Sequence, residues 1–323
     1  MARPPFQPGL TISSDWAGRR LDLALVDFEP GLSRSRWQAL IRAGHVTLQG
    51  EPVLRPGHLL EGGEILSWEI PEVPPTQDSQ GQVVRDLPIV HLDDAICVIN
   101  KPAGLLSHRN HAAQALAVPE LLARAIGHLP EGAEPMRPGI VHRLDRGTSG
   151  LMVLARTPEA MEFLLAAFAE RQVQKTYAAL VMGTPRFDSE YIDAPIERDP
   201  RKPERRRIAR PGEGKPASTL IEVVERFGDV ACLCHAHPKT GRTHQLRVHL
   251  ASRDLPIMGD SLYRPRHVRE DALPDACRRL ARPALHAASL SFTHPTTGEP
   301  VAFHAELPED MRLALEALRN AFA

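Results

Sequence analysis

The segment Ile140-Val-His-Arg-Leu-Asp-Arg-Gly-Thr-Ser-Gly150 leads directly into the apolar run Leu151-Met-Val-Leu-Ala155. The apolar run predicts a buried strand. The residues before it combine cations, a carboxylate, hydroxyls and glycines at the density that is typical of an active-site loop. Asp145 and Ser149 could equally accept backbone hydrogen bonds in an ordinary turn. The residue types of this segment therefore leave a functional loop and a structural turn both open.

Short strand patterns and helical patterns alternate around this segment. The best helix is predicted at 158–172, with Thr157 as its N-cap and Pro158 at its first position. Further strands are predicted at 95–100, 176–181, 220–224 and 231–237. This mixture predicts an α/β domain with helices and strands interspersed.

A smaller unit precedes this domain. Leu21, Ala24, Leu25 and Phe28 recur at the spacing of one helix face, and a second helix, capped by Ser33, ends at Gly44. Short strands are predicted after it, and the proline-rich stretch beyond has almost no apolar residues. We therefore predict four parts: a flexible N-terminus at 1–11, a small domain at 12–71, a linker at 72–86 and the main domain at 87–323.

Composition restricts the classes of protein that remain. The chain has 323 residues, a net charge of −1 and four cysteines without a CxxC pair. It has no apolar run long enough to span a membrane and no secretory leader pattern. We expect a cytoplasmic protein in a reducing compartment, not bound to membranes. Near-zero net charge means that any nucleic-acid binding must come from local basic clusters.

Three further features carry possible chemistry. The run 237–249 is rich in histidine and arginine and could hold a phosphate or an internal carboxylate, or be a solvated basic loop. The segment 198–215 has eight basic residues and reads as a solvated surface or a phosphate clamp. Strand alternation places Cys232 and Cys234 on one face and the nearby histidines on the other, so we predict no metal site there.

The chain resembles the pseudouridine synthases of the RluA type. Four motifs, in order along 87–323, carry the resemblance: Ile99-Asn-Lys-Pro-Ala-Gly104 with His108, His142-Arg-Leu-Asp-Arg-Gly-Thr-Ser-Gly150, Lys175-Thr-Tyr177, and Gly241-Arg-Thr-His-Gln-Leu-Arg-Val-His249 with Gly259-Asp260. Residues 12–71 look like the small RNA-binding domain named after ribosomal protein S-four. Gly147 departs from the family, which commonly has an acidic residue at this position.

The resemblance implies a mixed α+β fold with a mainly antiparallel sheet, and isomerisation of uridine to pseudouridine without cofactor or metal. Asp145 would act as nucleophile at C1′ or as base at C2′ of the ribose. Arg247 would pair with Asp145 and orient it. Tyr177 would stack on the uracil and could assist removal of the C5 proton, and Arg143 would fill the stack that the flipped base vacates.

The resemblance also implies RNA as the partner. Besides Arg143, the residues expected to hold phosphates are Arg34, Arg36 and Arg42 in the small domain and Arg205, Arg206, Arg207 and Arg242 in the main domain. We expect a monomer acting on large-subunit ribosomal RNA. The alternatives are the same activity on transfer RNA and a non-catalytic RNA-binding ribosome-assembly factor.

Overall fold

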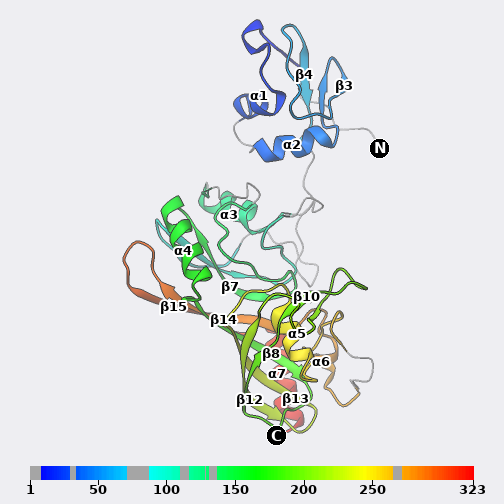
Figure 1. Cartoon of the computed structure of the whole chain (residues 1–323), viewed down its shortest axis with the longest axis vertical. Helices are drawn as coiled ribbons and strands as arrows, with labels where there is room; N and C mark the ends of the chain where they lie inside the picture. The colour runs from blue at the N-terminus through cyan, green and yellow to red at the C-terminus, as the bar shows by residue number, and fades with distance from the viewer. Residues whose placement is uncertain are drawn as a thin grey trace. The chain divides into compact units, whose positions relative to one another are not determined.

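The structure is a computed structural model that describes residues 9–29, 34–70, 87–109, 116–127, 129–130, 137–264 and 271–323. The chain divides into two compact units, Met1–Pro74 and Pro75–Ala323, which we describe separately (Figure 1). The predicted linker 72–86, the predicted cap Ser33 and residues 1–8 lie outside the described residues. Within the described ranges, no helix has both the length and the apolar content to cross a bilayer.

The first unit packs two helices on a four-stranded sheet of order β1-β4-β2-β3. Its elements are β1 (Leu10–Thr11), η1 (Ser14–Trp16), α1 (Leu21–Phe28), α2 (Arg34–Arg42), β2 (Val46–Leu48), β3 (Glu51–Pro52) and β4 (Ile65–Trp68). Leu10 and Thr11, which we had placed in the flexible N-terminal segment, pair with β4. The helices bury the predicted apolar face, with Trp37 fully buried and edge-on to Trp68.

The second unit is built on a nine-stranded sheet of order β5-β6-β7-β14-β8-β13-β12-β9, with β15 paired to β14. The strands are β5 (Ile89–Leu92), β6 (Ile96–Lys101), β7 (Ser149–Ala155), β8 (Gln174–Met182), β9 (Ser189–Asp193), β12 (Ser218–Phe227), β13 (Ala231–Pro238), β14 (Leu285–Thr293) and β15 (Pro300–His304). Among the described pairs of this sheet, only β7 and β14 run parallel. The predicted mixed fold with a mainly antiparallel sheet is confirmed.

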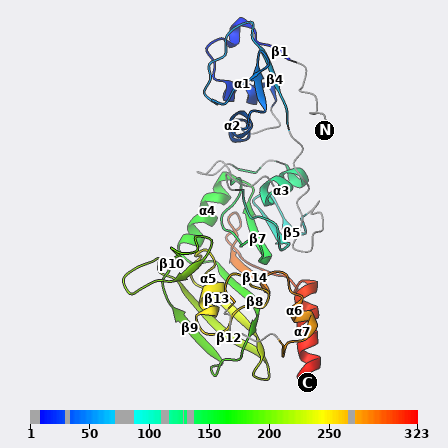
Figure 2. The same cartoon turned by 90° about the vertical axis from the view of Figure 1, so that its right-hand side faces the viewer.

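Five helices and a separate hairpin complete the described part of this unit. They are α3 (Val118–Ile126), α4 (Pro158–Ala169), α5 (Gln245–Ala251), α6 (Asp275–Arg278), α7 (Glu309–Ala321) and the two-stranded hairpin β10 (Ile196–Arg198) with β11 (Arg206–Ile208). Helix α4 lies along β7, and α6 lies beside α7 near the C-terminus (Figure 2).

Helix α4 begins as predicted and ends earlier. The Thr157 hydroxyl accepts a hydrogen bond from Ala160 N at 3.2 Å, and Met161 and Leu164 pack into the core of the β6–β7 region. We had extended this helix to 172, but it ends at Ala169 because Arg171 has a φ of +62°. The left-handed backbone at Arg171 stops helical propagation.

The sheet register brings the sequence motifs together. Gly150 pairs with Ala287, Ala287 pairs with Tyr177, and Tyr177 pairs with Ala236, so these residues form one row across four strands. Gly150 is required here, because a Cβ atom would lie 2.4 Å from the carbonyl oxygen of Ala287 and its φ is +113°. The loop before β7, the start of β8 and the end of β13 therefore lie close to one another.

Candidate active site

A cavity of about 400 Å³ lies where these segments meet. Its lining comes from the loop 141–148, from Phe168 to Lys175 around the end of α4, from Tyr177 on β8, and from 238–247 at the end of β13 and the start of α5. It includes the predicted catalytic residues Asp145, Tyr177 and Arg247 and the predicted RNA-binding residues Arg143 and Arg242. Segments distant in sequence thus contribute to one concave site, as is typical of enzymes.

The backbone around Asp145 is fixed by Ser107. The Ser107 hydroxyl donates to the Leu144 carbonyl at 2.7 Å and lies 3.0 Å from Leu144 N, which donates to it. Thr148 N closes the turn by donating to the Asp145 carbonyl at 3.0 Å. The Asp145 side chain retains 19% of its exposure. The loop therefore holds a carboxylate toward the cavity without sealing it from substrate.

A buried lysine, Lys101, also binds the backbone of the loop that contains Asp145. Lys101 is fully buried, and its ammonium donates to the carbonyls of Pro102 at 3.0 Å, Leu105 at 2.9 Å and Arg146 at 3.4 Å. Burial lowers the pKa of Lys101 to about 7, and the charge of Asp145 opposes this shift. Lys101 belongs to the motif at 99–104, but the sequence alone indicates no role for it.

Arg247 is clamped by a different carboxylate from the one we expected. Its Nε and Nη2 donate to the two oxygens of Asp260 at 2.6 and 2.7 Å, and only Nη1 approaches Asp145 Oδ2, at 3.6 Å. Burial alone would lower the pKa of Arg247, but the hydrogen bonds and charge of Asp260 raise it above its ordinary value. The two-donor fork therefore orients Arg247 itself, and its third nitrogen faces Asp145.

Tyr177 lies in β8 with 9% of its surface exposed and lines the cavity. Burial raises its pKa above the ordinary value, and the charge of Asp145 adds to the shift. A phenol with a raised pKa stays protonated at neutral pH, so little phenolate is present to act as a base. Its position and protonation state favour a ring that stacks on the substrate.

The cavity lining also includes two histidines, His142 and His244, to which the sequence patterns assign no role. His142 accepts a hydrogen bond from Val153 N at 3.0 Å and stacks on Phe168, and burial lowers its pKa to about 3, so it serves the structure of the loop. His244 instead lies 3.9 Å from Asp145 through its Nε2. Spacing in the sequence does not distinguish the two, because only the packing decides which ring faces the carboxylate.

The predicted RNA-binding arginines of the second unit have unequal surroundings. Arg143 is exposed at the cavity, with Nη1 3.2 Å from His108 Nε2, and Arg242 is exposed with Nε donating to the Pro216 carbonyl. Arg207 pairs with Glu197 across the β10–β11 hairpin at 2.6 Å. Arg205 and Arg206 are half-buried on the same hairpin. The hairpin charge is thus partly neutralised within the protein.

In the first unit, Arg34 also pairs with a carboxylate of the protein itself. Its guanidinium bonds to the buried carboxylate of Asp22 at 3.0 Å, together with Arg20 and Gln38. Burial would raise the pKa of Asp22, but these donors lower it to about 2. Arg42 is exposed in the last turn of α2. Arg36 lies in α2, and its side chain is outside the described part of the structure.

Gly147, where the resemblance leads us to expect an acidic residue, packs against another segment. A Cβ atom at this position would lie 2.9 Å from Cδ of Pro283. An acidic residue here would require Pro283 to move. The absence of a side chain at Gly147 therefore allows Pro283 to pack closely against the turn that contains Asp145.

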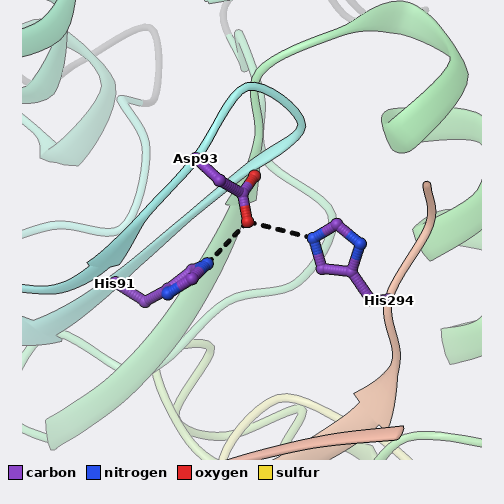
Figure 3. Close-up of side chains that lie close together, drawn as sticks. All are labelled: His91, Asp93 and His294. Atoms are coloured by element: carbon purple, nitrogen blue, oxygen red, sulfur yellow. Dashed lines mark hydrogen bonds and ion pairs between the residues drawn. The ribbon is translucent and has the colours of Figure 1, made fainter. Parts of the chain in front are cut away.

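Among the described residues, His91, Asp93 and His294 form a group with metal-ligand chemistry (Figure 3). Asp93 Oδ2 lies 2.5 Å from His91 Nε2 and 3.0 Å from His294 Nε2. However, His294 Nδ1 accepts hydrogen bonds from the backbone N–H groups of Thr296 and Thr297. The single proton of a neutral ring then lies on Nε2 and is donated to Asp93, so this nitrogen is not free to bind a metal. The hydrogen bond between Asp93 and His294 instead connects the turn between β5 and β6 to the turn between β14 and β15.

Removal of divalent metals is therefore expected to change neither the rate of catalysis nor the melting temperature. The measurement is enzymatic rate and thermal unfolding with and without EDTA, followed by addition of zinc. A rate that falls with EDTA and returns with zinc would point to a metal at His91, Asp93 and His294 or at the Cys232 and Cys234 pair, whose sulfur atoms lie 3.5 Å apart.

The fold and the cavity together are typical of an enzyme. A carboxylate, an aromatic ring and a clamped arginine line one concave site, and basic residues lie around it. A family model described as RNA pseudouridylate synthase matches residues 95–252, and an S4 domain model matches 19–66.

Relatives with known names extend the match over almost the whole chain. "Ribosomal large subunit pseudouridine synthase D" of Neisseria meningitidis serogroup A is 40% identical over 319 residues, covering 96% of this chain and 82% of the relative. The protein of the same name from Nitrosomonas europaea is 38% identical over 311 residues, covering 96% and 88%. This chain belongs to the RNA pseudouridylate synthase family and is an isomerase that acts on RNA.

A solved structure agrees with this assignment. "Human RNA Pseudouridylate Synthase Domain Containing 4" is 28% identical with a TM-score of 0.57, and the match covers 72% of this chain and 93% of that one. The resemblance that we drew from the four motifs is confirmed, as is the S4 domain at the N-terminus. The roles of individual site residues stay predictions.

Proposed function

We propose that this protein isomerises specific uridines to pseudouridine in large-subunit ribosomal RNA, with Asp145 as the catalytic residue. The observation that carries the proposal is the partly exposed carboxylate of Asp145 at a cavity that the Tyr177 ring also lines, with the clamped Arg247 facing that carboxylate. Nη1 of Arg247 lies 3.6 Å from Oδ2 of Asp145, so the arginine can help to hold the carboxylate in place.

The reaction breaks the N1–C1′ bond, turns the uracil within the cavity and forms a C5–C1′ bond. The C5 proton leaves, and N1 gains a proton, so the product has the atoms of the substrate. Asp145 can attack C1′ as a nucleophile while the N1–C1′ bond breaks, and the bond between Asp145 and C1′ then breaks as C5 attacks C1′. Alternatively, Asp145 can take the C2′ proton as a base while N1 leaves, and this proton returns to C2′ when the C5–C1′ bond forms. Both routes need an ionised carboxylate beside the sugar, held so that the reacting atoms meet.

The other predicted residues fit around this step. Tyr177 would stack on the uracil and keep it in the cavity while it turns. A paired uridine must leave its helix to reach the site, and Arg143, exposed at the cavity, would occupy the vacated stack. Arg205, Arg206 and Arg242 would hold phosphates near the target.

The S4 domain and the names of the relatives support ribosomal RNA as the substrate. Transfer RNA is the second candidate. A non-catalytic assembly factor is disfavoured because Asp145, Tyr177 and Arg247 all line the cavity. We also propose that the protein acts as a monomer in the cytoplasm.

Release of tritium from RNA labelled at C5 of uridine tests the proposal. The wild-type chain is expected to release tritium from large-subunit ribosomal RNA much faster than from ribosomal RNA of the small subunit or from transfer RNA. Release from transfer RNA alone would contradict the proposed target. Binding without release from any of these RNAs would favour the assembly factor.

Removal of residues 1–75 is expected to leave a folded catalytic unit with weaker RNA binding. The chain divides at Pro74, and the cavity is lined only by residues of the second unit. The truncated chain should melt cooperatively and isomerise uridine at saturating RNA, with a raised dissociation constant and less discrimination between sites. Unfolding of the truncated chain, or inactivity at saturating RNA, would contradict this division of labour.

A further inference from the structure

Tyr263 connects the basic hairpin to the residues around Asp145. Its side chain is buried, and its hydroxyl oxygen accepts a hydrogen bond from the backbone N–H of Arg206 in β11 at 2.7 Å. The same oxygen lies 2.9 Å from Nδ1 of His244. The guanidinium carbon of Arg247 lies over the Tyr263 ring, 4.9 Å from its centroid. None of these contacts follows from the motif spacing in the sequence.

We assign the directions of these hydrogen bonds so that Nε2 of His244 carries its proton toward Asp145. The Tyr263 oxygen accepts from Arg206, so its own proton is available to His244. Burial raises the pKa of Tyr263, which keeps that proton in place. Burial also lowers the pKa of His244, so the ring has one proton at neutral pH. Because Nδ1 accepts from Tyr263, this proton lies on Nε2.

The protonated Nε2 faces the catalytic carboxylate. It lies 3.9 Å from Oδ2 of Asp145, and Nη1 of Arg247 approaches the same oxygen at 3.6 Å. Both distances exceed a hydrogen bond, and a small closure on substrate binding would bring both donors within hydrogen-bond distance of this oxygen. Two donors on one oxygen would leave the other oxygen of Asp145 for the sugar.

The backbone holds the His244 ring in this place. His244 has a φ of +57°, in the left-handed region that residues other than glycine adopt uncommonly and in which histidine and asparagine are enriched, and it directly precedes α5. Tyr263 itself packs with Ile196 and Val248 in a cluster shared by the hairpin and α5. The ring is therefore fixed by the turn on one side and by Tyr263 on the other.

We propose that His244 and Tyr263 are positioning residues for Asp145, anchored on the β10–β11 hairpin through Arg206 N. His244 directs a proton donor at Oδ2, and Tyr263 sets the tautomer and the angle of the imidazole. This inference rests on the proposed function. Its alternative is that Tyr263 only fills the cluster between the hairpin and α5.

Tyr263→Phe separates the two explanations because it keeps the ring, the contact with Arg247 and the packing, and removes only the hydroxyl. We expect the single-turnover rate of tritium release at saturating enzyme to fall by about tenfold. The dissociation constant for RNA and its salt dependence should stay within about twofold of wild type. The matched control is Tyr191→Phe, which removes a hydroxyl from an exposed residue of β9 and should leave the rate unchanged.

His244→Asn provides a second, independent variant. Asparagine tolerates the left-handed backbone and places an acceptor near the Nδ1 position, but it cannot extend to Asp145. The same rate loss of about tenfold is expected. The double variant should be about as slow as either single variant, because both changes interrupt one chain of hydrogen bonds.

Three outcomes would overturn the inference. The first is a Tyr263→Phe chain with a wild-type rate, and the second is a raised dissociation constant at an unchanged saturating rate. The third is a double variant whose losses multiply. If Tyr263→Phe lowers the melting temperature strongly, His244→Asn still decides. A wild-type chain that releases no tritium from any RNA would instead overturn the proposed function itself.

Discussion

Replacement of Asp145 by asparagine is expected to abolish pseudouridine formation while RNA affinity stays within a few-fold of the wild-type value. The amide keeps the size of the carboxylate, and the backbone bonds that Ser107 and Thr148 make around it do not involve the side chain. An amide, however, can neither attack C1′ nor remove the C2′ proton. The measurement is tritium release from C5-labelled RNA alongside a binding titration of the same RNA.

Asp188→Asn is the matched control for this change. The Asp188 side chain is 92% exposed and pairs only with Arg226 among the described ion pairs, so the same chemical change there should leave the rate unaltered. Turnover near the wild-type rate in Asp145→Asn would remove Asp145 from the mechanism. Loss of both binding and melting cooperativity would show that the carboxylate is needed for the fold.

Replacement of Arg247 by lysine is expected to lower the saturating rate by at least about tenfold, roughly 1.4 kcal/mol of transition-state stabilisation. Arginine makes two bonds to Asp260 and still presents Nη1 to Asp145, whereas one ammonium cannot reproduce this planar arrangement. RNA affinity should change little, because the charge is kept and the group is buried.

Single-turnover rates at saturating enzyme, combined with salt-dependent binding, check this prediction. If Arg247 served the RNA backbone, lysine would weaken binding and flatten its salt dependence while the saturating rate stayed at the wild-type value. That result would contradict the role of Arg247 beside Asp145. Asp260→Asn should slow the enzyme as Arg247→Lys does, because it loosens the same clamp.

The sequence predicts the main elements and the members of the site because both depend on local patterns. Thr157 and Pro158 define the start of α4 by capping alone, and apolar runs define β6 and β7. The four motifs predict that Asp145, Tyr177 and Arg247 belong together, and the row of paired residues from Gly150 to Ala236 explains physically why they do.

The pairing of charges could not be predicted in the same way. Asp145 and Asp260 are both carboxylates within reach of Arg247, and the fork goes to Asp260 because that carboxylate is fully buried while Asp145 is open to the cavity. Charged residues are ordinarily exposed, so a sequence gives no signal that Lys101 is buried. Arg34 pairs with Asp22, and Arg207 pairs with Glu197. Only the folded structure brings these pairs together.

Mapping of pseudouridines in ribosomal and transfer RNA tests the central claim most directly. RNA would be compared from cells with the gene, without it, and complemented with either the wild-type or the Asp145→Asn gene. The account predicts that one or more pseudouridines of the large-subunit RNA disappear on deletion, return with the wild-type gene and stay absent with Asp145→Asn. An unchanged large-subunit RNA, or full restoration by Asp145→Asn, would contradict it.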